Sequence, residues 1–186
     1  MAEATELIAE QTVSGSSTNT VTFGSIPQTH DDLKFIMQYM STSTSGAWDY
    51  DYLTTNFNGD TTNNYYQQGF MRIRGNNSPL PNMQAGFQSR VSYDSIGTSL
   101  NGQSNPGICE FNIPRYSDSG RMKEGTARFA WLSSIDSDWN NGYSLTAPIA
   151  FWVYTPTGAI TSVSFKGLAA NWKAGSKFSL YGISNS

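Results

Sequence analysis

Apolar residues occupy every second position in several segments of this chain, which is the pattern of β-strands with one buried face. In residues 32–40, the positions of Leu33, Phe35, Met37 and Tyr39 follow this rule. Strand-like patterns also occur at 6–13, 20–24, 50–57, 65–74, 87–93, 108–113, 126–135, 143–154, 158–167 and 175–183. Helix signals are nearly absent. The pattern predicts an all-β fold, a single antiparallel β-sandwich of jelly-roll type with roughly eight to ten strands.

One pair of neighbouring segments predicts a specific hairpin. Residues 50–57 run into Asn58 and Gly59, and residues 65–74 follow a few positions later. The Asn-Gly dipeptide tolerates positive φ and favours tight β-turns. We therefore expect 50–57 and 65–74 to pair with each other.

A second segment predicts a central strand. In residues 143–154, Ile149, Phe151 and Val153 alternate with Ala150, Trp152 and Tyr154, so that both faces are apolar. Such strands are covered on both sides in most sheets. This one is expected to be buried on both faces.

Composition limits the classes of function. The chain has 186 residues, which suits one domain over 1–186, and residues 1–5 lack a pattern and are expected to form a flexible N-terminal arm. Charged residues make up 13% and the net charge is −3, which argues against a nucleic-acid partner. No apolar stretch resembles a signal peptide or reaches the roughly 20 residues of a membrane span. We expect folding in a cytoplasm and no membrane partner.

The inventory of reactive side chains is small. His30 is the only histidine and lies in a turn-like PQTHDD sequence, which indicates a solvated loop residue. Cys109 is the only cysteine and is expected to fill space in the core. One histidine and one cysteine cannot supply the usual ligands of a zinc site. The sequence predicts no catalytic residue, no metal site and no cofactor.

Two less favoured hypotheses, glycosidase activity and calcium binding, stay open for the acidic and amide residues. A glycosidase needs only two carboxylates, and the candidates are Asp49, Asp51, Asp60, Asp94, Glu110, Glu124, Asp136 and Asp138. Nothing in the sequence pairs any two of them. Two oxygen-rich segments offer ligands for calcium, namely Asn56, Asn58, Asp60 and Asn64 in one and Asp136, Asp138 and Asn140 in the other. Neither matches an EF-hand, and Asn-Gly turns are common in hairpins.

An aromatic group flanks the expected hairpin and is the candidate contact site. It consists of Trp48, Tyr50, Tyr52, Tyr65 and Tyr66. Aromatic faces beside Asn and Asp side chains can stack on sugars. The favoured alternative is that these residues make cross-strand contacts or cover a subunit interface.

Several short motifs carry a resemblance to a known group of proteins. They are the FGSIPQT turn at 23–29, the FNGD sequence at 57–60 and the terminal FSLYGI at 178–183. With the segments around them, the chain resembles a group of tailed-bacteriophage virion proteins that are common in phages of aquatic bacteria. The resemblance spans nearly the whole chain. It implies a structural role in the capsid or tail fibre, a β-sandwich fold and an oligomer that is often a trimer.

The sequence-based hypothesis is a non-enzymatic virion structural protein. We expect a capsid decoration (cement) protein that binds the major capsid protein, forms a homotrimer, and is made in the host cytoplasm and assembled onto the particle. The alternative is a tail-fibre or receptor-binding module that recognises host surface glycan through the aromatic group. A carbohydrate-active enzyme, which would need two carboxylates of individual importance, represents a different class.

Overall fold

The computed structural model describes residues 3–15, 17–42, 51–70, 87–88, 91–96, 106–134, 143–146, 149–167 and 170–185. All regular secondary structure in these ranges is β-strand. The strands are β1 (Glu3–Thr12), β2 (Thr20–Phe23), β3 (Asp32–Tyr39), β4 (Asp51–Phe57), β5 (Tyr65–Phe70), β6 (Phe87–Gln88), β7 (Val91–Ile96), β8 (Gly107–Pro114), β9 (Lys123–Ser134), β10 (Tyr143–Thr146), β11 (Ile149–Tyr154), β12 (Val163–Gly167) and β13 (Lys177–Asn185).

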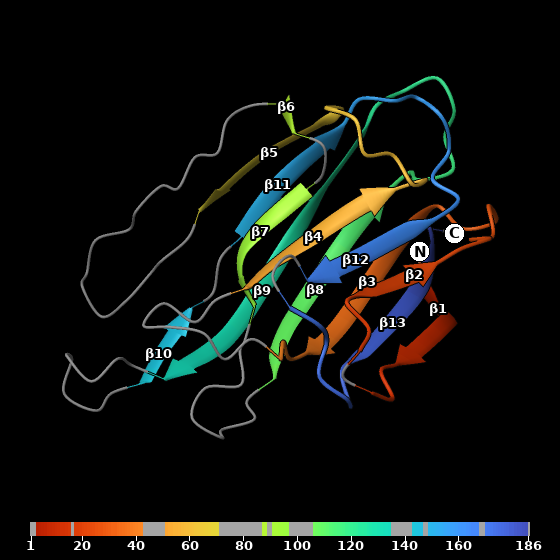
Figure 1. Cartoon of the computed structure of the whole chain (residues 1–186). Helices are drawn as coiled ribbons and strands as arrows, with labels where there is room; N and C mark the ends of the chain where they lie inside the picture. Colours follow the sequence, from red (N-terminus) through yellow and green to blue (C-terminus); the bar gives the residue numbers. More distant parts are fainter. Residues whose placement is uncertain are drawn as a thin grey trace.

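The strands form two antiparallel sheets that face each other (Figure 1). Ten of them make the body of the fold, in the order β1-β13-β3-β8-β9-β11-β5 in the larger sheet and β2-β12-β4 in the smaller. Three further strands add to these sheets, because β6 pairs with β5, β10 with β9 and β7 with β4. The all-β, antiparallel β-sandwich predicted from the sequence is confirmed.

The first and last strands lie side by side in the larger sheet. The pairing runs from Glu3 opposite Asn185 to Thr12 opposite Lys177, with a register shift between Leu7 and Ala9. Residues 3–5 therefore belong to β1, and the expected flexible arm is wrong for them because their backbone groups pair with β13. Met1 and Ala2 lie outside the described residues.

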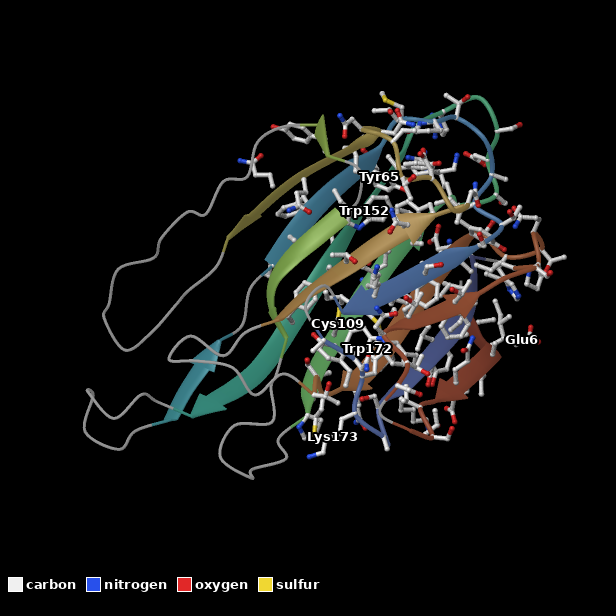
Figure 2. All side chains as sticks on the ribbon, viewed as in Figure 1. Glu6, Tyr65, Cys109, Trp152, Trp172 and Lys173 are labelled. Atoms are coloured by element: carbon white, nitrogen blue, oxygen red, sulfur yellow. The ribbon has the colours of Figure 1, made fainter. Side chains whose placement is uncertain are left out.

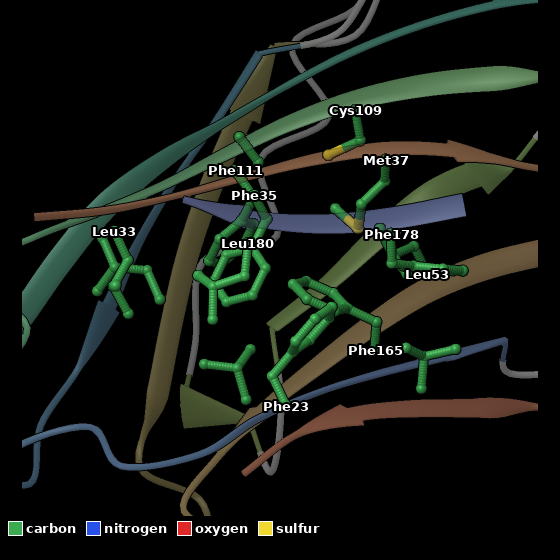
Figure 3. Close-up of a cluster of buried hydrophobic side chains, with 14 of the residues drawn as sticks. Phe23, Leu33, Phe35, Met37, Leu53, Cys109, Phe111, Phe165, Phe178 and Leu180 are labelled. Carbon is green, nitrogen blue, oxygen red and sulfur yellow. The ribbon is translucent and has the colours of Figure 1, made fainter. Parts of the chain in front are cut away.

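The core lies between the two sheets and is dominated by aromatic rings. Phe35 and Phe111 from the larger sheet pack against Phe165 from the smaller, with ring centroids 4.9 Å and 5.7 Å from that of Phe165 (Figure 3). Trp152 stacks on Phe111 at 5.3 Å with only 7° between the planes. Cys109 is fully buried among them, as expected, and burial raises the pKa of its thiol well above its ordinary value. Close aromatic pairs of this kind add about 0.5–1.5 kcal/mol each to the stabilisation from buried area.

The predicted hairpin of 50–57 with 65–74 is wrong, although its turn forms. Asn58 and Gly59 have φ values of 52° and 69°, and the Asp60 amide donates to the Phe57 carbonyl over 2.8 Å. The chain then crosses to the other sheet, because β4 pairs with β12 whereas β5 pairs with β11. The connection is thus an arch between sheets. It places the inward-facing rings of Phe57, from the smaller sheet, and Tyr65, from the larger, in contact across the core, with centroids 5.8 Å apart.

Two further strand predictions need correction. Residues 87–93 are divided between sheets, since β6 pairs with β5 and β7 pairs with β4. Strand β11 is covered on one face only. Its inward residues are buried, whereas Ile149 and Phe151 on the outward face are 42% and 49% exposed. The expectation of a strand buried on both faces is therefore wrong.

Candidate interaction surface

The structure separates the members of the predicted aromatic site. Trp48 and Tyr50 lie outside the described residues, and only the backbone of Tyr52 is described. Tyr65 is completely buried, so it is not a surface contact residue, whereas Tyr66 is 36% exposed. Successive strand residues point to opposite faces. Of the predicted set, Tyr66 is therefore the member whose described side chain reaches the surface.

Tyr65 instead closes the arch between the sheets. Its hydroxyl accepts a hydrogen bond from the Phe57 amide over 3.0 Å and donates to the Asp60 carbonyl over 2.9 Å. Burial raises the pKa of Tyr65 to about 12, with a further contribution from the nearby Asp60 carboxylate. Figure 2 shows Tyr65 near Trp152, toward one end of the sandwich. The side chain therefore has a structural role.

The Asp60 carboxylate organises the residues that follow the turn. It accepts hydrogen bonds from the amide and hydroxyl of Thr62 over 2.8 Å and 2.6 Å, and from the Asn64 side chain over 2.8 Å. Partial burial alone would raise the pKa of Asp60, but these bonds and one from Tyr154 outweigh it and lower the pKa to about 2. The carboxylate is held in its ionised form.

The other amides of this predicted calcium segment also make hydrogen bonds. The Asn58 side-chain oxygen accepts from the amides of Thr161 and Ser162 over 2.8 Å and 3.1 Å, and its nitrogen donates to the Ala159 carbonyl. The side chain of Asn56 donates to the Asp60 carbonyl over 2.8 Å. These bonds fix the arch to the segment before β12. The second predicted segment, with Asp136, Asp138 and Asn140, lies outside the described residues.

His30 is not the solvated loop residue expected from its sequence. Its side chain is only 10% exposed. The ring lies over Gly182, where an added β-carbon would come within 2.3 Å of it, and Nδ1 is 3.3 Å from the Ser184 hydroxyl. Nε2 lies 3.9 Å from a carboxylate oxygen of Glu6. The ring closes one end of the core because Gly182 leaves room for it.

The candidate acids whose side chains the structure describes are Asp60, Glu110 and Glu124, and each of them contacts a polar or basic group. Glu110 accepts a hydrogen bond from the Asn112 side chain over 3.0 Å, and Glu124 lies 3.7 Å from the Arg115 guanidinium. In the described part of the chain, no three side chains of His, Cys, Asp or Glu lie close enough together to hold a metal ion. The remaining candidates are Asp49, Asp136 and Asp138 outside the described residues, and Asp51 and Asp94, of which only the backbone is described.

The most distinctive surface is an exposed apolar patch on the outer side of the larger sheet. We call it the β11 face and define it as Tyr66, Ile149, Phe151 and Val153. In the pairing of β11 with β5, Val153 lies opposite Tyr66, and Phe151 lies opposite the partly exposed Gln68. Ile149, Phe151 and Tyr66 are among the most exposed large apolar side chains of the described residues. Sequence reasoning missed this surface because it expected β11 to be covered.

Charged residues of opposite sign border the β11 face on the neighbouring strand β9. Glu124 lies opposite Val153, Thr126 opposite Phe151 and Arg128 opposite Ile149. Glu124 and Arg128 are both exposed. The face is therefore an apolar strip flanked by an acid at one end and a base at the other.

No protein-family model, no curated protein and no solved structure matches the chain. In the ranges that the structure describes, no helix has the length and apolar character needed to cross a membrane.

Proposed function

We propose that this chain is a non-enzymatic structural protein of a bacteriophage virion, most specifically a capsid decoration protein that binds the major capsid protein. The observation that carries the proposal is the β11 face, in which Ile149 and Phe151 are 42% and 49% exposed on a strand of the larger sheet. Large exposed apolar patches rimmed by polar residues mark protein-protein contacts. A protein that works by assembly needs such a surface.

The energetics favour contact at this face. Burying a side chain such as Ile or Phe completely contributes about 1.5–3 kcal/mol, so covering the half-exposed residues of the β11 face would contribute several kcal/mol before the cost of association. Charged residues make up only 13% of the chain, which limits charge repulsion between closely packed copies. Both features suit a protein fixed at high density onto a particle.

The resemblance to phage virion proteins supports a phage particle as the place of this contact. The motifs at 23–29, 57–60 and 178–183 belong to it, and the arch at 57–60 is a structural element of the sandwich. The proposal includes self-association, for which the resemblance favours a trimer. It also includes synthesis in the host cytoplasm and assembly onto the particle, with no cofactor, nucleic acid or membrane as partner.

Binding to particles tests the proposal directly. Particles from a phage that lacks the gene for this protein are mixed with the purified chain, sedimented and analysed by quantitative gel electrophoresis. We expect saturable binding at a fixed number of copies per particle and greater resistance of the filled heads to heat. Absence of binding to complete heads would contradict the proposal.

A second candidate, a tail-fibre module that binds host glycan, is favoured by one observation. Tyr66 and Phe151 are exposed aromatic residues on adjacent strands of the β11 face, at 36% and 49%. Aromatic faces of this kind can stack on sugars. Binding on a glycan array that Tyr66→Ala and Phe151→Ala both abolish, with copies confined to the tail, would favour this candidate over decoration.

A further inference from the structure

We infer that the β11 face binds a second copy of this chain through a two-fold contact, with Phe151 at its centre. This inference assigns the β11 face to the self-association in the proposed function, as a dimer in place of the trimer, and leaves contact with the major capsid protein to another surface of the chain. It rests on the proposed function for its role on a particle. The contact itself is a property of the chain in solution. Three features of the chain support it, namely the register of β11 with β9, the exposure of the outward residues of both strands, and the signs of the charges on β9.

The register places the outward residues in three rows across the two strands. Thr126 and Phe151 form the middle row. Glu124 with Val153 forms the row on one side, and Arg128 with Ile149 forms the row on the other. Glu124 and Arg128 are therefore separated by four residues along β9, or about 13 Å at roughly 3.3 Å per residue.

A two-fold axis that runs along the middle row makes this arrangement complementary to itself. Rotation about that axis brings Phe151 of one copy onto the partner's Phe151, and Ile149 of one copy onto the partner's Val153. It also brings Glu124 opposite the partner's Arg128, twice in each contact. The apolar residues then meet at the centre and two opposite-charge pairs close the ends. Such self-complementarity is the requirement for an isologous dimer.

The distances allowed by sheet packing are compatible with this contact. Packed sheets lie about 10 Å apart, with strand directions within about 30° of each other. Long side chains such as Glu and Arg reach across this gap. Glu124 lies 3.7 Å from Arg115 in the monomer, but the side chains of both residues are more than half exposed, and exposed pairs contribute only about 0–1 kcal/mol. That weak pair leaves Glu124 able to meet a second cation.

Strand β8, which lies next to β9, adds no repulsion between like charges at the ends of the contact. Glu110 on β8 lies beside Arg128, and its carboxylate already accepts a hydrogen bond from Asn112. Asn112 lies opposite Thr126 in the middle row, so Pro114, two residues further along β8, lies in the row of Glu124. Under the same rotation, Glu110 therefore faces the partner's Pro114. Glu110 is therefore not brought opposite a like charge on β8 of the partner. A two-fold contact predicts an even number of chains, which sets it apart from the trimer that the resemblance implies.

Charge reversal tests the contact without removing the apolar centre. Glu124→Arg and Arg128→Glu each place like charges together at both ends, whereas the double variant restores opposite charges with the positions exchanged. Sedimentation equilibrium of the full chain at low salt should show a wild-type dimer. Each single variant should raise the dissociation constant about tenfold or more, and the double variant should return it to within about threefold of wild type.

Two further variants complete the design. Lys166→Glu changes an exposed cation on the outer side of β12 in the smaller sheet, and the dimer should keep its wild-type affinity. Phe151→Ser should weaken the dimer at least as much as the single charge reversals. Unchanged thermal unfolding at concentrations at which the wild type is monomeric verifies that each variant folds.

Three results would overturn the inference. They are a monomer at all concentrations up to about 100 μM, a trimer, and a dimer whose affinity is unchanged by Phe151→Ser and by both single charge reversals. None of these results depends on a virion, so the inference can fail while particle binding succeeds. Particle binding can equally fail while the two-fold contact is confirmed.

Discussion

The substitution Asp60→Asn should destabilise the protein at neutral pH and lose this effect in acid. The carboxylate accepts three hydrogen bonds from Thr62 and Asn64, and its pKa is lowered from 3.8 to about 2 in the folded chain. At 1.36 kcal/mol per pKa unit this difference corresponds to about 2.4 kcal/mol. Because Asp60 is partly exposed, screening by solvent reduces the expected loss to about 1–2 kcal/mol.

The sign of the pH dependence follows from the lowered pKa. A carboxyl group with a folded pKa below its unfolded value stabilises the fold fully above the unfolded value near 3.8, and this contribution is lost as the pH falls toward 2. The difference in unfolding free energy between the wild type and Asp60→Asn should therefore be constant from pH 7 to about pH 5 and should shrink between about pH 4 and pH 2. The asparagine variant does not titrate at this position.

Urea unfolding followed by tryptophan fluorescence at several pH values measures this difference. A loss of 1–2 kcal/mol should also lower the thermal midpoint by about 2–8 °C for a chain of this size. Glu110→Gln is the matched control, because the Glu110 carboxylate accepts a hydrogen bond from the Asn112 side chain that the oxygen of glutamine can also accept. It should change stability by less than about 0.5 kcal/mol. A pH-independent difference for Asp60→Asn, or an equal effect in the control, would refute the reasoning.

Three further substitutions test the packing and the arch, each by denaturant unfolding. Gly182→Ala should cost about 1–3 kcal/mol, because its β-carbon would come within 2.3 Å of the His30 ring, whereas Gly15→Ala, with no atom within 4 Å, should be neutral within about 0.5 kcal/mol. Equal effects of the two would contradict the placement of His30. Asn58→Ala should cost about 1–3 kcal/mol, since it removes an acceptor of two backbone hydrogen bonds and leaves alanine at a φ of 52°; a neutral result would show that the arch does not depend on this side chain. Phe111→Ala should cost about 3–5 kcal/mol because it empties a fully buried site at the centre of the core, and a loss below about 1 kcal/mol would contradict the packing.

The alternation of residue types was sufficient to predict the sandwich and much of its core. In β3, Leu33, Phe35, Met37 and Tyr39 are all completely buried, as the period of two requires. The same rule placed Phe111 and Ile113 inward in β8. Burial of one face is a local property of a strand, so a local pattern is enough to predict it.

The pairing of strands was not predictable in the same way. The Asn58-Gly59 turn has the positive φ values that its sequence favours, but turn chemistry fixes only a few backbone angles. The sheet that the next strand joins depends on contacts with residues far along the chain, such as the pairing of β5 with β11 and of β4 with β12. The terminal pairing of β1 with β13 is another distant contact that no local pattern indicates.

The prediction that both faces of β11 are buried was wrong for a related reason. Both faces of β11 are apolar, so periodicity does not show which one is buried. The neighbouring strand β9 carries the information, because Glu124, Thr126 and Arg128 lie on the same face as Phe151, but this requires the register of the pairing. Tyr65 and Tyr66 differ for the same reason, since Tyr65 lies opposite the buried Tyr154 and Tyr66 opposite Val153.

The position of the protein on an intact virion tests the central claim most directly. Cryo-electron microscopy of particles at side-chain resolution would locate the sandwich through its large aromatic core and would identify what covers the β11 face. The account predicts density for this chain on the outside of the capsid, in contact with the major capsid protein. Density confined to the tail, or no density for this chain on the particle, would contradict it.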